Sequence, residues 1–339
     1  MTRARHLFAR WEFGLVGLIA FVLVVGQLVD HDLLSGYNLE TTALNGIVLL
    51  CLAFGLAPVI VTGDIDLSVV GTLSLTGVFV AKVWALGLNI WVAIGLGLVI
   101  GLLCGFANGL VVVLLDLPAL AVTLGTMGAY TGVSFLILKG TAITQFPSVL
   151  VTLGSSNLTG TPIPISLVVA VVFGLVLTYV LHGTTYGKSL FATGGSRRAA
   201  LFSGIPVNRV RIIAFVISGL FAGVAAVFYL GNYDTAQAGM AADQLLPAVT
   251  AVILGGVSAY GGTGTIPGVA LAAALLALLQ SALGLHGLSG EGQTIAVGVL
   301  LVVAIGSGSL LHSGRRRRRG PLTRAHRGAT PAAIGPTES

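Results

Sequence analysis

Long runs of apolar residues, broken by short polar or glycine-containing segments, fill most of the chain. Most runs approach the ~20 residues that an α-helix needs to cross the hydrocarbon core of a bilayer. The pattern therefore predicts an all-α polytopic membrane protein with about ten transmembrane helices. We expect them near residues 13–29, 41–62, 68–86, 89–113, 118–138, 163–182, 211–230, 244–260, 267–285 and 292–311.

The composition excludes a large soluble domain. Of the 339 residues, 55% are apolar and only 8% are charged, and the mean hydropathy is +1.01. A soluble globular protein carries about 25% charged residues, so this chain has too few to cover its surface against water. The two cysteines, Cys51 and Cys104, lie inside apolar runs, where they are expected to be small buried hydrophobic residues.

The distribution of charge predicts the orientation, because Lys and Arg in short loops stay cytoplasmic. With ten spans and a cytoplasmic N-terminus, both tails and the loop 183–211 face the cytoplasm, and 15 of the 17 Lys and Arg residues lie on that side. We therefore expect a cytoplasmic segment 1–12, a transmembrane permease-like domain 13–311 and a basic, disordered cytoplasmic tail 312–339. The run Arg315–Arg319 follows the last span directly, so we assign it to anionic lipid and not to nucleic acid.

Ionisable residues are rare within the spans, but uncharged polar residues are present. Such groups either hydrogen-bond between helices or line a path for a neutral hydroxylated solute. The candidates for such a path are Asn45, Asn108, Thr123, Thr126 and Gln280. Asp64 and Asp66 fall between the second and third spans, where we expect them to be half-exposed at a turn.

Glycines at positions 95, 97, 101, 105 and 109 recur along one span. Small residues at this spacing let helix backbones approach closely, so we expect tight packing of this helix. No group of His, Cys, Asp and Glu has metal-ligand spacing, and no cofactor is expected.

The string from Gly183 to Ser189 ends in Gly-Lys-Ser, like a phosphate-binding loop. Its first glycine is one residue too close, and it follows an apolar helix, whereas a phosphate-binding loop follows a strand. The chain is therefore not expected to be an enzyme or to bind ATP itself.

The loop 183–211 contains a short helix-forming stretch. Ser196 can cap its N-terminus and Gly204 can stop it, which leaves a helix of barely two turns that is not stable alone. It either packs on the ends of its own spans or docks on another subunit. The small residues Ala199 and Ala200 would let it enter a groove on a partner closely.

The string G-G-x-x-x-A-A-x-x-S-G-I in this loop resembles the cytoplasmic coupling segment of permease subunits in bacterial ABC importers of the ribose/xylose type, a family that includes autoinducer-2 carriers. The matching segment consists of Gly194, Gly195, Ser196, Arg197, Arg198, Ala199, Ala200, Ser203, Gly204 and Ile205. Two turn motifs resemble the same family: Gly63, Asp64, Asp66 and Ser68 in G-x-I-D-L-S, and Gly255, Gly256, Gly261, Gly262 and Gly264 in L-G-G-x-S-x-x-G-G-x-G. With G-x-x-N-G at 105–109 and P-x-x-x-x-T-L-G at 118–125, the resemblance covers roughly residues 40–310 in order.

The chain departs from the family pattern at several positions. Asp64 stands where the family usually has a second glycine, and Val70 replaces another. Ser196 and Arg197 stand where Asn and an acidic residue are common. Arg197 and Arg198 make this surface basic, so we expect an acidic groove on the partner.

The resemblance implies a permease subunit of an ATP-binding-cassette importer in the bacterial plasma membrane, which forms the pathway for a monosaccharide or similar small polyhydroxylated solute. Its implied partners are a second permease chain, identical or homologous, two cytoplasmic ATP-binding subunits and an extracytoplasmic solute-binding protein. An ion-coupled secondary transporter is the alternative, although the lack of intramembrane carboxylates argues against ion coupling. A channel would need rings of carbonyls or charges, which the sequence does not indicate.

Overall fold

The computed structural model describes residues 2–159, 161 and 163–318. It is built almost entirely of helices, with one two-stranded antiparallel ladder in which Ile143 pairs with Ala236. The elements are α1 (Thr2–Val29), α2 (Gly36–Val61), α3 (Val69–Ala85), α4 (Ile90–Leu114), α5 (Ala119–Leu138), β1 (Ile143–Thr144), α6 (Ser148–Ser155), α7 (Ile165–Gly183), α8 (Thr185–Gly195), α9 (Arg197–Phe202), α10 (Val207–Tyr233), β2 (Thr235–Ala236), the 3-10 helix η1 (Ala242–Gln244), α11 (Leu245–Leu254), α12 (Ile266–Leu285) and α13 (Gly290–Arg318).

Each of the ten expected spans contains a helix, but the helices differ in length. Seven in the described part of the chain are long and apolar enough to cross a membrane, namely α1, α2, α4, α5, α7, α10 and α12. Apolar stretches in α3, α11 and α13 are shorter. The expected span 244–260 is wrong in its second half, because α11 ends at Leu254. A ten-residue helix rises only ~15 Å, about half of the hydrocarbon core.

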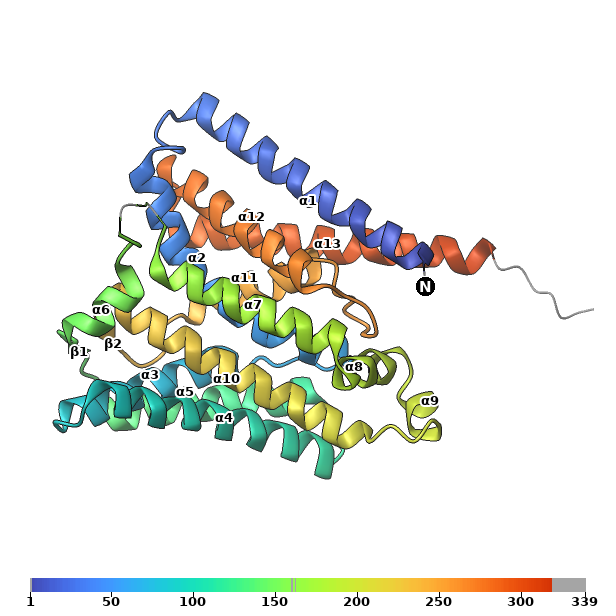
Figure 1. The fold of residues 1–339 in the computed structure, drawn as a ribbon, viewed down its shortest axis with the longest axis horizontal. Coiled ribbons are helices and arrows are strands. Elements are labelled where there is room, and N and C mark those ends of the chain that lie inside the picture. The colour runs from blue at the N-terminus through green and yellow to red at the C-terminus, as the bar shows by residue number, and fades with distance from the viewer. Residues whose placement is uncertain (1, 160, 162, 319–339) are drawn as a thin grey trace, which may run out of the picture.

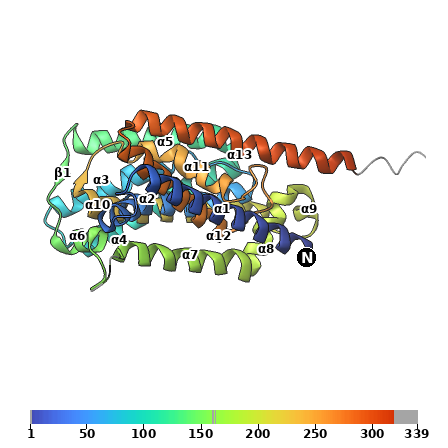
Figure 2. The same ribbon diagram turned by 90° about the horizontal axis from the view of Figure 1, so that it is seen from above.

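The helices run between two ends of the molecule (Figure 1). At one end lie the N-terminal end of α1, the short helices α8 and α9 and the C-terminal end of α13. At the other lie β1, β2 and α6. The view from above shows the same separation (Figure 2). The helix α13 continues to Arg318, beyond residue 312 where we expected the tail to begin, and residues 319–339 lie outside the described part.

The core is centred on α2 and α10. In their most apolar stretches 78% and 67% of the residues are buried, against 6% in α1 and 11% in α5. Phe54 and Phe221 meet edge to face between the two helices, with ring centroids 6.1 Å apart. The apolar sequence of α1 and α5 is therefore placed on the outside, where a bilayer would cover it.

Backbone contact between α4 and α10 confirms the packing predicted from the glycine spacing. A side chain at Gly101 would come within 2.6 Å of the Gly219 carbonyl oxygen, and one at Gly105 would collide with that of Phe215. Gly109 is similarly close to Ile212. Gly97 instead faces Val80 of α3, and nothing lies within 4 Å of an added Cβ on Gly95. Three of the glycines therefore set how closely α4 approaches the central helix.

Replacing Gly105 with Leu should destabilise the bundle by about 3 kcal/mol or more, because the backbone of α10 cannot yield as a flexible side chain would. The matched control is Gly95→Leu, which adds the same side chain on the same helix in open space. The fraction of monodisperse protein remaining after heating in detergent measures the difference. Equal loss in both variants would contradict the assigned contact.

Candidate functional site: a polar cavity and an ionic junction

A polar cavity of about 730 Å³ opens between α2, α12 and the start of α13. Its size is within the usual range for small-molecule sites, ~300–1,000 Å³. It is lined by Asn38, Thr41, Thr42, Asn45, Gly46, Tyr233, Asp243, Gln244, Ala277, Gln280, Ser281, Gly284, Leu285, Gly290, Glu291, Gln293 and Thr294. Two of the five expected path residues, Asn45 and Gln280, are among them.

The cavity offers hydrogen-bonding groups with few charges. Its described lining residues supply amides, hydroxyls and two carboxylates, and none of them is Lys or Arg. Asn45 Oδ1 accepts a hydrogen bond from the Tyr233 hydroxyl at 3.1 Å. The hydroxyl of Thr42 is buried and has no hydrogen-bond partner within the protein. A buried polar group without a partner is uncommon in proteins.

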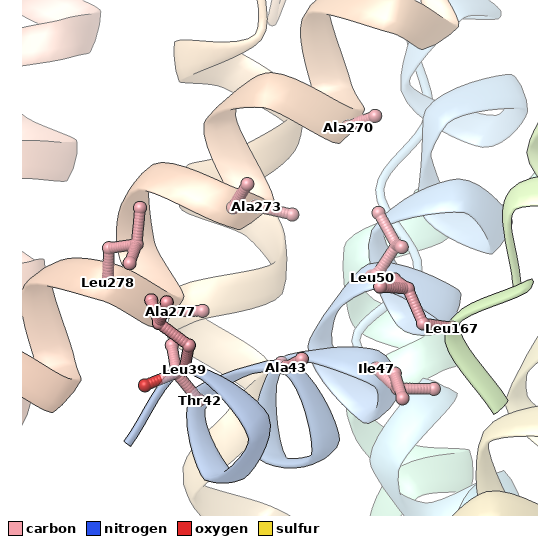
Figure 3. Close-up of a pocket in the computed structure, with 12 residues that line it drawn as sticks. Leu39, Thr42, Ala43, Ile47, Leu50, Leu167, Ala270, Ala273, Ala277 and Leu278 are labelled. Carbon is pink, nitrogen blue, oxygen red and sulfur yellow. The ribbon is translucent and has the colours of Figure 1, made fainter. Parts of the chain in front are cut away.

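An apolar crevice of about 210 Å³ adjoins this cavity and shares Thr42 with it. Figure 3 shows it between α2 and α12, with Leu167 of α7 at one side, and aliphatic side chains such as Ile47 and Leu278 around it. A surface of this kind cannot hydrogen-bond a solute. The polar cavity is therefore the candidate solute site.

The expectation that Asp64 and Asp66 are half-exposed is wrong, since they are 5% and 1% exposed. The segment between α2 and α3 does not form a surface turn. After a turn at Thr62 and Gly63, residues 64–67 pass through the bundle without helix or strand, and α3 begins only at Val69. Burial of the two carboxylates is possible because partners distant in the sequence surround them.

Asp64 forms ion pairs with two arginines. The Nε and Nη2 atoms of Arg211 donate to its two carboxylate oxygens at 2.8 and 3.0 Å, a two-point contact. Arg197 donates from Nη2 to Asp64 Oδ1 at 2.7 Å. Charge-assisted pairs of this geometry are among the stronger hydrogen bonds in proteins. We call these three residues the ionic junction.

Asp66 lies deeper and is held by neutral groups. Its Oδ1 accepts from the Ser68 hydroxyl at 2.6 Å, and its Oδ2 from the Ser218 hydroxyl at 2.7 Å. Asn108 donates to the Ser68 hydroxyl at 2.6 Å and accepts from Tyr130 at 3.0 Å. The chain of donors thus connects α3, α4, α5 and α10.

The remaining path candidates also belong to this interior. The Thr123 hydroxyl accepts from the Leu67 amide at 3.1 Å, and Thr126 donates within its own helix to the Thr123 carbonyl at 3.3 Å. Asn108 and Thr123 are fully buried. The structure therefore places two of the five residues at the cavity and two, Asn108 and Thr123, in hydrogen bonds between elements, whereas Thr126 bonds only within its own helix.

The Gly-Lys-Ser string is part of a helix. Thr184 caps α8, with its hydroxyl accepting from the Gly187 amide, and Lys188 and Ser189 follow inside the helix. Gly187 packs against the Leu181 carbonyl oxygen. A phosphate-binding loop follows a strand and has free backbone amides. Here the string follows the helix α7, and it lies within the helix α8.

The short helix predicted at 196–204 is α9. The Ser196 hydroxyl caps it by accepting from the Ala199 amide at 3.3 Å. Gly204 ends it with a φ of +76°, while the Ile205 amide donates back to the Ala200 carbonyl. Such a left-handed glycine is a common helix stop.

The exposed face of α9 differs from expectation. Ala200 is 3% exposed and is packed against its own chain, so its small size serves this internal packing and not entry into a groove. Leu201 and Phe202 are 57% and 93% exposed. An apolar side chain this exposed outside the spans is typical of a binding surface. No sequence pattern singles out Phe202, because the residues of the family-like string around it are mainly small or charged.

The glycine motifs meet beneath α9. The Gly262 amide donates to the Val61 carbonyl at the end of α2 at 2.9 Å, and a side chain on Gly194 would collide with both groups. Gly262 has a φ of +80°, as glycine permits. Gly63, Gly256, Gly261 and Gly264 also have positive φ, whereas Gly255 has a φ of −69° and packs against Val269. Gly195 has open space around it.

The family described as "Branched-chain amino acid transport system / permease component" matches residues 38–305, most of the chain. The chain belongs to this family. It is 33% identical to the autoinducer 2 import system permease protein LsrD of Escherichia coli K12, over 92% of this chain and 98% of the relative. The LsrD protein of Salmonella paratyphi B is 33% identical over 87% and 90%. Among solved structures, PsaBC from Streptococcus pneumoniae in complex with Fab matches with a TM-score of 0.47 and 15% identity, over 83% of this chain and 95% of that chain. That similarity is too distant to bear on function.

The permease is therefore a multi-pass protein of the bacterial plasma membrane and the transmembrane component of an ABC importer. Importers of this kind work with ATP-binding subunits and a solute-binding protein. Membership in this family decides against the ion-coupled alternative. The polar cavity and the ionic junction are the two places where this permease brings its polar groups together.

A hydrophilic thiol reagent should label Asn45→Cys and Gln280→Cys in nanodiscs, because both residues line the water-filled cavity. Asn108→Cys should react at least about tenfold more slowly, because its site is fully buried within a hydrogen-bonded network. Cys51 and Cys104 are 0% and 7% exposed, so the background should be low. Labelling of position 108 as fast as position 45 would show that the division of these residues is wrong.

Proposed function

We propose that the permease forms the pathway for a monosaccharide or similar small polyhydroxylated solute, such as the autoinducer 2 named for its relatives. The observation that carries this proposal is the lining of the polar cavity. Amides and hydroxyls match the alternating donors and acceptors of a polyol. An amino acid would bring a carboxylate, which the described lining offers no Lys or Arg to bind. The N-terminus of α13 does not substitute, because Glu291 occupies its first turn.

We also propose ten membrane crossings with both termini in the cytoplasm, a transmembrane domain 13–311 and a cytoplasmic tail from about residue 312. Support comes from the common position of the α1 N-terminus, α9 and the end of α13 at one end of the molecule (Figure 1). The Lys and Arg residues gather toward that end, as the positive-inside rule requires. The polar cavity, with Asp243 and Glu291, then opens toward the extracytoplasmic side, where a solute-binding protein would deliver its cargo.

A second permease chain, identical or homologous, would pack against the outward face of α5. Gly125, Gly128 and Gly132 lie on this face at helical spacing, and an added Cβ at each would meet nothing within 4 Å. Small residues in such a row allow close helix pairing in a membrane. With two permease chains, the importer would hold two ATP-binding subunits, one for each coupling segment.

The coupling segment 194–205 would dock on the ATP-binding subunit through α9. Phe202 is its most exposed apolar side chain, and Arg198 is exposed beside it. Arg197 is already paired with Asp64, so Arg198 is left to meet an acidic groove. ATP binding and hydrolysis would then favour one permease conformation over the other through their different affinities.

In proteoliposomes that contain the permease with its ATP-binding subunits and solute-binding protein, labelled ribose or autoinducer 2 should accumulate only with ATP, and labelled leucine should not. Gln280→Leu should reduce uptake up to about tenfold, as expected for the loss of one or two neutral hydrogen bonds. Leu278→Met, on the neighbouring apolar crevice, is the control. Leucine accumulation, or full uptake by the Gln280 variant, would exclude this pathway.

Replacing Phe202 with Ala should weaken co-purification of the ATP-binding subunit by about tenfold or more, because one buried aromatic anchor often contributes ~2 kcal/mol to an interface. The permease itself should accumulate normally, since Phe202 is 93% exposed. Tyr260→Ala is the matched control, because this aromatic residue is 77% exposed on a neighbouring loop. Undiminished binding by the Phe202 variant would place the docking surface elsewhere.

A further inference from the structure

Two departures from the family pattern touch each other. Asp64 stands where glycine is usual, Arg197 stands where an acidic residue is common, and their side chains meet at 2.7 Å. Each departure alone would be costly. A basic residue at 197 without Asp64 would face the buried cation of Arg211, and Asp64 beside an acidic residue would face a like charge. The pair therefore functions as a unit with Arg211.

The ionic junction has a fixed part and a peripheral part. The side chains of Asp64 and Arg211 are 5% and 7% exposed, so neither can lose its partner without leaving a buried charge. Arg197 is 42% exposed and is the first residue of α9. It thus joins a helix of six residues, too short to be stable alone, to a charge fixed in the bundle.

The fixed part continues into the core. Asp66 follows Asp64 by two residues and is hydrogen-bonded to Ser218. Ser218 lies seven residues beyond Arg211 on α10, or ~10 Å along the helix. The segment 64–68 is thus attached to α9 at its start and to the central helix at both carboxylates. A displacement of α9 would act on this segment directly.

We propose that the ionic junction transmits movement of the coupling segment to the buried segment 64–68, with Asp64 as a positioning residue for transport. This rests on the coupling role proposed above for 194–205. Asp64 is buried and does not line the polar cavity. Its function is to make α9 and the start of α3 move together when the ATP-binding subunits change state.

The test uses the complete importer in proteoliposomes, with four variants. Asp64→Gly and Arg197→Glu each restore the family residue at one position. The double variant restores both, and places a carboxylate at 197 beside Arg211. Arg209→Glu makes the same charge change as Arg197→Glu, but on an exposed residue of α10. Solute transported per ATP hydrolysed is the main readout, together with co-purification of the ATP-binding subunit.

Both single variants should keep the ATP-binding subunit and hydrolyse ATP, since Phe202 is unchanged. Their uptake per ATP should fall about tenfold, within the range typical of coupling between sites, and the double variant should recover to within about threefold of wild type. Arg209→Glu should match wild type. A merely structural role would lower the amount of folded permease without changing the ratio of uptake to hydrolysis.

Normal uptake per ATP in both single variants would overturn the proposal, as would a double variant no better than the single ones. If Asp64→Gly fails to accumulate, Arg197→Gln and Arg197→Lys carry the test, because both keep the buried Asp64–Arg211 pair. The Arg197→Lys variant should then transport more solute per ATP hydrolysed than the Arg197→Gln variant. Equal ratios of transport to hydrolysis in the two variants would count against the ionic junction. Failure of the proposed function is a different result: wild type would show no ATP-dependent uptake at all.

Discussion

Inside a membrane protein every backbone amide and every charge needs a partner, and the segment joining α2 to α3 is where this requirement is most severe. Two carboxylates and several backbone amides enter the bundle there. They cannot use the hydrogen bonds of a helix, so they need partners from other elements. The Leu67 amide finds Thr123, Asp66 finds two serines, and Asp64 finds two arginines. These bonds in turn fix the relative positions of α4, α5, α9 and α10. The polar interior thus orders elements whose apolar surfaces alone would pack in several ways.

Local sequence patterns were sufficient for most of the long helices. Apolar runs predicted where they lie, glycine spacing predicted the tight packing of α4 without identifying its partner, and Ser196 with Gly204 predicted the limits of α9. These depend on neighbours a few residues away. The burial of Asp64 depends on Arg211, 147 residues away, and no local pattern indicates that pairing. For the same reason the role of Asn108 could not be separated from that of Asn45, although both are amides within apolar runs.

Asn45 and Asn108 lie in separate polar regions of the structure, and this separation answers two opposing requirements of a permease. A solute pathway requires polar groups that exchange partners readily, whereas a tightly packed bundle requires polar groups that do not. The cavity-facing set has a hydroxyl without a partner at Thr42, and the interior set has each carboxylate multiply bonded. The apolar crevice beside the cavity adds little polar surface of its own. The polar groups of the cavity thus lie mainly on α2, α12 and α13, and the multiply bonded groups of the interior lie on α4, α5 and α10.

The contact between Asp64 and Arg197 also constrains how this permease can diverge or be recombined. Asp64 cannot be lost alone without leaving the buried cation of Arg211 unpaired, and a carboxylate at position 197 would place like charges together. A grafted coupling segment with an acidic residue at position 197 would place that residue against Asp64, even though the graft ends many residues away in sequence. Segment exchange is therefore limited wherever it separates Asp64 from Arg197. In an evolving lineage the two residues would have to change together, or through a neutral intermediate at position 197.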